Sequence, residues 1–150
     1  MRPFRPQGAA SAPLGNINAD TIRRAEEAVS QLADQYRDWV RGDIAKLRDC
    51  LATSGADADG RRAAYKVVRQ VAHDLRGQGT TFGYPLITRI AQSVSQVVKE
   101  NADGEDADAI LHAHIDAIAD VVESDTADAA SDKAAEIIET LERAVGRPLA

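Results

Sequence analysis

Apolar residues recur at steps of three and four over most of the chain, and this spacing restricts the fold more than any other feature. The longest run comprises Ile22, Ala25, Val29, Leu32, Tyr36, Trp39, Val40, Ile44, Leu47 and Leu51. Such steps place side chains on one face of an α-helix. The phase continues across Gly42, so we expect one long helix over about residues 19–53, capped by Asn18 or Asp20.

Four further segments show the same pattern and are joined by short connections. We predict helices over about residues 57–82, 84–101, 105–123 and 126–145. Asp125 is expected to cap the last of them, and Pro85 suits the first turn of the 84–101 helix. Long amphipathic helices with short connections become antiparallel neighbours. The sequence therefore predicts an all-α fold, an up-down antiparallel four-helix bundle with an additional helix.

The N-terminal segment differs in composition from the rest of the chain. Residues 1–17 hold three of the five prolines, together with Gly, Ala and Ser. Such a segment lacks the apolar side chains that a core needs. We expect residues 1–17 to form a disordered arm and residues 18–150 to form one helical domain, which is long enough for a core.

Charge and composition exclude several classes of function. The formal net charge is −6, whereas general nucleic-acid binding needs a basic surface. Residues 1–15 lack the apolar stretch of a secretion signal, and no run is long enough to cross a membrane. His112 and His114 are two residues apart and point to different helix faces, which makes a poor metal pair. We expect a cytoplasmic monomer that binds no nucleic acid, membrane, metal or cofactor.

A histidine, a cation and a glycine lie together in the predicted 57–82 helix. Arg76 and Gly77 follow His73 by three and four residues, so all three share one face. Other residues predicted to lie within about 60° of His73 around the helix axis are Arg62, Lys66, Arg69 and Thr80. The apolar residues of this helix lie on the opposite face, so its amphipathicity exposes His73. An exposed imidazole is a nucleophile, Arg76 can bind phosphoryl oxygens, and Gly77 leaves room for a second domain.

These residues resemble the histidine-containing phosphotransfer (HPt) family of phosphorelays. The family pattern is a His, an apolar residue, a Lys or Arg, a Gly and small residues, with a small residue some ten positions after the His. The matching residues here are His73, Leu75, Arg76, Gly77, Gln78, Gly79 and Gly83. Arg76 replaces the commoner Lys with a planar cation, and Gln78 stands where the family usually has Ser or Ala.

The resemblance implies that His73 carries a phosphoryl group to and from receiver-domain aspartates. The implied partners are response-regulator receiver domains and a hybrid histidine kinase, and the chain is a phosphocarrier without its own ATP site. Gln92 is a candidate for the polar residue that such proteins place near the His on the following helix. Two alternatives stay open. One is a non-catalytic helical adaptor that binds an acidic partner, and the other is a phosphoacceptor domain like that of chemotaxis kinases, detached from its kinase.

Overall fold

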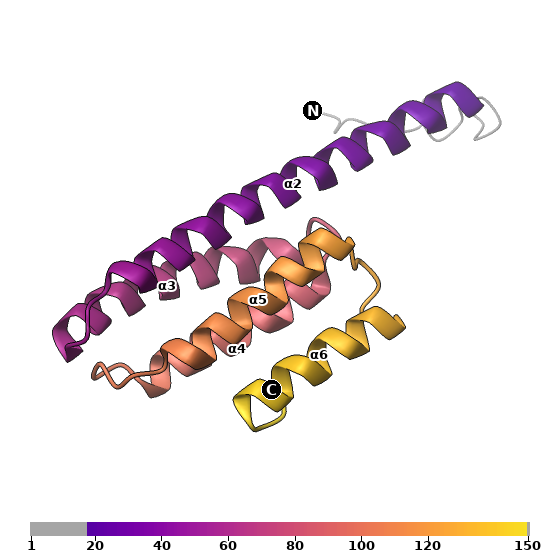
Figure 1. Cartoon of the computed structure of the whole chain (residues 1–150). Helices are drawn as coiled ribbons and strands as arrows, with labels where there is room; N and C mark the ends of the chain where they lie inside the picture. The colour runs from indigo at the N-terminus through magenta and orange to yellow at the C-terminus, as the bar shows by residue number, and fades with distance from the viewer. Residues whose placement is uncertain (1–17, 150) are drawn as a thin grey trace, which may run out of the picture. The chain divides into compact units, whose positions relative to one another are not determined.

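The computed structural model describes residues 18–149, and the regular secondary structure in this range is helical. The five helices are α2 (Ala19–Thr53), α3 (Ala58–Gly79), α4 (Pro85–Glu100), α5 (Asp108–Ser124) and α6 (Asp132–Val145) (Figure 1). The described residues contain no strand. The predicted all-α class and the single long first helix are therefore confirmed, whereas the predicted disordered arm, residues 1–17, lies outside the described residues.

The chain divides into two units, Met1–Asp34 and Gln35–Ala150, and α2 contributes to both. In the first unit, the Asn18 side chain accepts a hydrogen bond from the Thr21 backbone N–H at 2.8 Å, which satisfies one free donor of the first turn. Asn18 is thus the cap of α2. It is one of the two residues, Asn18 and Asp20, that the sequence suggested for this position.

The apolar stripe of α2 is exposed in the first unit. Ile22, Val29 and Leu32 are 50%, 67% and 50% exposed. The periodicity predicts the helix correctly here, but it shows only that one face is apolar and not what covers that face.

The core lies in the second unit and collects the apolar faces of all five helices. From α2 it takes Tyr36, Val40, Ile44, Leu47 and Leu51. α3 lies beside α4, α4 beside α5, and α5 beside α6 (Figure 1). Polar contacts join α2 to this group. Among them, the Cys50 thiol donates to the Ala64 carbonyl, and Arg48 pairs with Asp116 at 2.9 Å.

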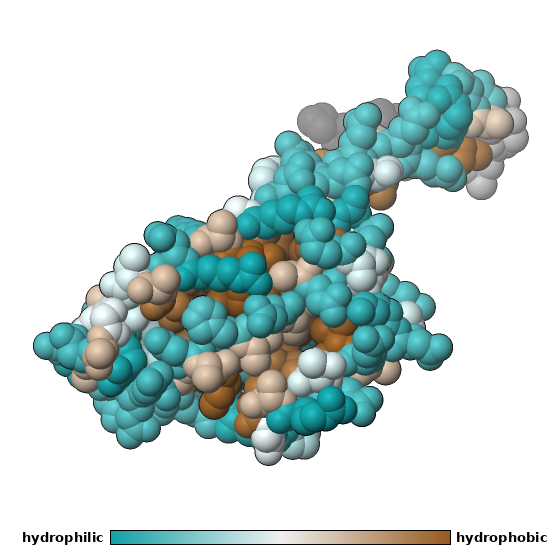
Figure 2. Space-filling view, viewed as in Figure 1, coloured by the Kyte–Doolittle hydropathy of each residue, from teal (hydrophilic) through white to brown (hydrophobic). Residues whose placement is uncertain are grey.

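The surface is largely hydrophilic on the face seen in Figure 2. Hydrophobic side chains show mainly between the helices of the second unit, with a smaller patch toward the N-terminal end of α2. Among the helices of residues 18–149, none combines the length and the apolarity that a bilayer crossing requires.

The last helix begins later than predicted. Asp125 does not cap it: this residue adopts the left-handed conformation, with φ 52°, and ends α5. Its carboxylate accepts hydrogen bonds from the Tyr84 hydroxyl at 2.5 Å and from Arg37 at 2.8 Å. The cap of α6 is Ser131, whose hydroxyl oxygen accepts from the Ala134 N–H. Sequence spacing favoured Asp125 because Asp is a good cap, but its side chain is bound elsewhere.

A histidine outside the predicted site is fully buried. The Nδ1–H of His114 on α5 donates to the Ile110 carbonyl at 2.8 Å, so Nε2 accepts from the Ser93 hydroxyl of α4, also at 2.8 Å. Burial lowers the pKa of His114, because the charged form loses its hydration. The hydrogen bonds place a neutral imidazole between two helices.

We predict that this histidine makes the fold less stable in mild acid. The unfolded chain takes up a proton on His114 below about pH 6.5, whereas the folded chain does so only at lower pH, so the free energy of unfolding falls as pH decreases through this window. Urea unfolding from pH 7.5 to 5 should show a larger loss for the wild type than for His114→Gln. The half-buried His112 supplies a control; an equal change of slope in His112→Gln would contradict the assignment to His114.

Candidate functional site

α3 positions the candidate site by burying its opposite face. Asp57 begins the helix, and its carboxylate accepts from the Gly60 N–H at 2.6 Å. The buried residues of α3 are Ala64, Tyr65, Val68, Val71, Ala72, Leu75 and Gly79. Since these occupy the side of the helix turned to its neighbours, His73, Arg76 and Gly77 are exposed, as the sequence predicts.

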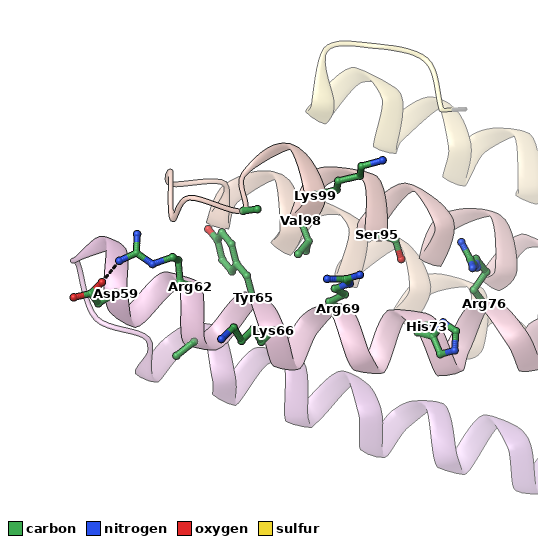
Figure 3. Close-up of a pocket in the computed structure, with 12 residues that line it drawn as sticks. Asp59, Arg62, Tyr65, Lys66, Arg69, His73, Arg76, Ser95, Val98 and Lys99 are labelled. Atoms are coloured by element: carbon green, nitrogen blue, oxygen red, sulfur yellow. Dashed lines mark hydrogen bonds and ion pairs between the residues drawn. The ribbon is translucent and has the colours of Figure 1, made fainter.

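A groove with a volume of about 770 Å³ runs along α3 and gathers most of the predicted basic residues. Its lining includes Arg62, Lys66, Arg69, His73 and Arg76 (Figure 3). Figure 3 shows the guanidinium groups of Arg69 and Arg76 on the side of α3 next to α4. Arg69 precedes His73 by four residues and Arg76 follows it by three, so two cations flank the imidazole one turn away on either side.

α4 supplies the other wall, which sequence reasoning missed. Ser95, Val98 and Lys99 line the groove from α4, together with Ala102 just beyond its end. Helix periodicity could show that Lys99 is exposed, but not that this residue lines a groove between α4 and α3. The sequence signal that comes nearest to finding Lys99 is the expectation that consecutive helices are antiparallel, because this places the end of α4 beside the start of α3.

Three predicted residues do not line the groove. Gln92 is exposed and lies on α4 one turn before Ser95, nearer the α3–α4 connection. The backbone N–H of Thr80 donates to the Thr88 hydroxyl at 2.8 Å, and the two hydroxyls are 3.1 Å apart. Gly77 is exposed beside the groove. The structure thus brings Arg62, Lys66, Arg69, His73 and Arg76 together and leaves Gln92, Thr80 and Gly77 outside the lining.

The far end of the groove is fixed by hydrogen bonds to the α4–α5 connection. The Tyr65 hydroxyl donates to the Asp108 carboxylate at 2.6 Å and accepts from the Ala107 N–H at 2.9 Å. Burial, with the Asp108 hydrogen bond, raises the Tyr65 pKa to about 12, so this hydroxyl keeps its proton. Arg62 pairs with Asp59 and donates to the Asp103 carbonyl. These contacts hold the end of α4 beside the first turns of α3.

The other end of α3 terminates earlier than predicted. The helix ends at Gly79 rather than near Phe82, because the Gly79 carbonyl accepts from the Tyr84 N–H at 2.8 Å. Phe82 instead stacks on Tyr36 of α2, with ring centroids 4.8 Å apart. The positive φ of Gly83, 92°, turns the chain toward Pro85, which begins α4 as predicted.

Gly77 and Gly79 are both helical glycines, but they have opposite surroundings. A Cβ added at Gly77 meets no atom within 4 Å. A Cβ added at Gly79 lies 2.8 Å from the Thr88 backbone nitrogen and 3.0 Å from the Tyr84 carbonyl oxygen. Gly79 therefore allows α3 to pack closely on α4, whereas packing within the chain gives no reason for glycine at position 77.

The site carries no cluster suited to a metal ion. Across residues 18–149, no group of three or more His, Cys, Asp or Glu side chains is arranged to hold one. Comparison of the chain with protein-family models, curated proteins and solved structures finds no match. The function is therefore argued from the geometry of the groove.

The two glycines give a matched pair of substitutions. Gly77→Ala should raise the free energy of unfolding by up to about 1 kcal/mol, because Ala is the better helix former and the space is open. Gly79→Ala should lower it by about 1–3 kcal/mol through overpacking against Thr88. Urea unfolding followed by circular dichroism measures both values. A destabilised Gly77→Ala variant would show that Gly77 is needed for packing after all.

Proposed function

We propose that the protein is a histidine phosphotransfer protein that relays a phosphoryl group through His73 to and from receiver-domain aspartates. The observation that carries the proposal is the exposed His73 between Arg69 and Arg76 at the edge of a basic groove, with open space at Gly77. The motif around His73 adds the resemblance to the HPt family. We further propose that α2 to α5 form the up-down four-helix bundle of such proteins and that α6 is the additional helix.

The proposed reaction uses His73 as the nucleophile. A ring nitrogen of the imidazole attacks the phosphorus of a partner's aspartyl phosphate, and an N–P bond forms as the P–O bond to the aspartate breaks. The aspartate leaves as a carboxylate, and the imidazole loses its N–H proton to solvent. Arg76 and Arg69 stabilise the charge on the phosphoryl oxygens by charge-assisted hydrogen bonds. In the reverse direction, a receiver aspartate takes the group from phosphohistidine.

Exposure at the site fits a partner that is a whole domain. His73 and Arg76 both lie on the surface of α3, where the reacting aspartate of another protein can reach them. Gly77 removes the side chain that would stand one turn from the imidazole. A larger residue there would occupy the space that a docking loop needs, which is a reason for glycine at an open helical position.

Removing the imidazole should abolish phosphoryl acceptance. We expect receiver domains phosphorylated with ³²P-acetyl phosphate to transfer label to the wild-type chain, in acid-labile and base-stable form. His73→Gln should accept none while keeping its circular dichroism spectrum, because the side chain is exposed. His112→Gln is the matched control and should accept label normally.

The same assay separates the alternatives. If no receiver in a panel transfers label to the wild-type chain, the result would favour the non-catalytic adaptor. Label supplied only by the ATP-binding domain of a chemotaxis kinase would favour the detached phosphoacceptor domain. Label that persists in His73→Gln would contradict the assignment of the site.

Substitution of Arg76 by alanine should slow phosphoryl transfer without abolishing it. Losing one charge-assisted hydrogen bond typically costs about 1.5–3 kcal/mol, so Arg76→Ala should slow transfer by roughly ten- to a hundredfold. Arg76→Lys keeps the positive charge and should stay close to wild type. Rapid-quench measurement of label transfer gives the rates. Arg89→Ala, which removes an exposed arginine of α4 outside the groove lining, should leave the rate unchanged, and equal slowing in that variant would remove Arg76 from the mechanism.

A further inference from the structure

Most cations of the described chain have a partner within the protein, but four groove cations do not. Arg48 pairs with Asp116, Lys133 with Asp120 and Arg147 with Glu100, and most of the other arginines form similar bonds. Within residues 18–149, Lys66, Arg69, Arg76 and Lys99 make no ion pair or hydrogen bond, although all four line the groove. The only other cations in that range without such a bond are Lys46 and Arg89, which lie outside the groove lining.

The unpaired state of these cations is not caused by a shortage of acids. The chain has 24 acidic and 18 basic residues. Yet the groove lining includes a single acidic residue, Asp59, and it pairs with Arg62. Gathering unpaired like charges opposes folding, because they repel one another. The groove is therefore a concentrated positive surface on an acidic protein, available to an external anion.

One phosphoryl group cannot use all four cations. Arg69 and Arg76 lie one turn from His73, within reach of a phosphoryl group on its imidazole. Lys66 lies seven residues before His73, about 10 Å along the helix axis. Lys99 belongs to the same far end, because the bond from Arg62 to the Asp103 carbonyl holds the end of α4 there. Lys66 and Lys99 line the same groove and are not needed by the transferred group, so both are available to a second anionic ligand.

Building on the proposed phosphotransfer function, we propose that the far end of the groove, formed by Lys66 and Lys99, docks a short acidic segment of the receiver-bearing partner. Carboxylates of that segment form ion pairs with the two ammonium groups. Val98, Ala63 and Ala102 provide apolar contacts for its aliphatic carbons. The positive surface is short, since Glu100, Asp103, Glu105 and Asp106 follow Lys99 in the chain. This boundary favours a short acidic peptide segment over a long polyphosphate backbone.

A peptide probe tests this docking without any phosphoryl chemistry. The probe is a fluorescein-labelled eight-residue peptide of alternating aspartate and glutamate, measured by fluorescence anisotropy at low and at physiological salt. We expect saturable binding that weakens with salt. Lys66→Gln with Lys99→Gln should weaken binding about tenfold. The control, Lys46→Gln with Arg89→Gln, removes the same charge from exposed positions outside the groove and should change binding less than twofold.

Each contrary outcome overturns the inference in a distinct way. Equal weakening in the control pair would show that net charge alone attracts the peptide. Tighter binding of an eight-nucleotide single-stranded DNA than of the peptide would indicate a nucleic-acid ligand instead. Absence of peptide binding alongside normal label transfer to His73 would reject the acidic docking segment and leave the proposed function standing.

A second readout connects docking to transfer. In the labelled-receiver assay, the Lys66→Gln, Lys99→Gln variant should raise the receiver concentration at half-maximal transfer by a factor similar to its loss of peptide affinity. The control pair should not. Peptide binding by the groove in a chain that accepts no label would instead reject phosphotransfer and support an adaptor. An unchanged half-maximal concentration in the groove variant would show that the receiver does not use this end of the groove.

Discussion

The burial of one face of α3 determines almost everything about the candidate site. Val68, Val71 and Leu75 enter the core, and a helix that buries these positions must turn His73 and Arg76 outward. The same burial brings α4 alongside, since the close approach at Gly79 permits no side chain between the two helices. The groove is thus a product of core packing, and the charged residues on its rim contribute little to that packing.

Local physics accounts for the parts of the fold that the sequence could predict. The single helix from residue 19 to 53, its cap at Asn18 and the start of α4 at Pro85 depend on residues close together in the chain. The misplaced start of α6 depends on tertiary contacts. Asp125 is bound by Tyr84 and Arg37, which lie 41 and 88 residues away in the chain, and spacing within the last segment cannot reveal them.

The residues of the candidate site also divide into those that local sequence could predict and those that depend on tertiary packing. One helix carries Arg62, Lys66, Arg69, His73 and Arg76, so helical phase alone predicted their common face. Lys99 required knowledge of how α4 packs, and Gln92 was chosen on the correct helix but one turn from the groove. The sequence also could not show which cations form ion pairs. Lys66 and Arg48 are both exposed helical cations by their sequence pattern, and only the structure shows that Arg48 pairs with Asp116 whereas Lys66 forms no ion pair within residues 18–149.

The aromatic contact at the end of α3 contains one polar atom without a partner. The Tyr36 hydroxyl is buried and has no hydrogen bond, while its ring stacks on Phe82 in the connection that follows α3. A buried hydroxyl without a partner bears its desolvation cost in the closed state, and any opening that admits water to it recovers that cost. Local opening is therefore easier here than at a fully satisfied contact, and we expect the amides of Thr80–Gly83 to exchange through such opening. The Phe82 contact lies five residues beyond Gly77, so opening there would expose new surface close to the place where His73 meets solvent.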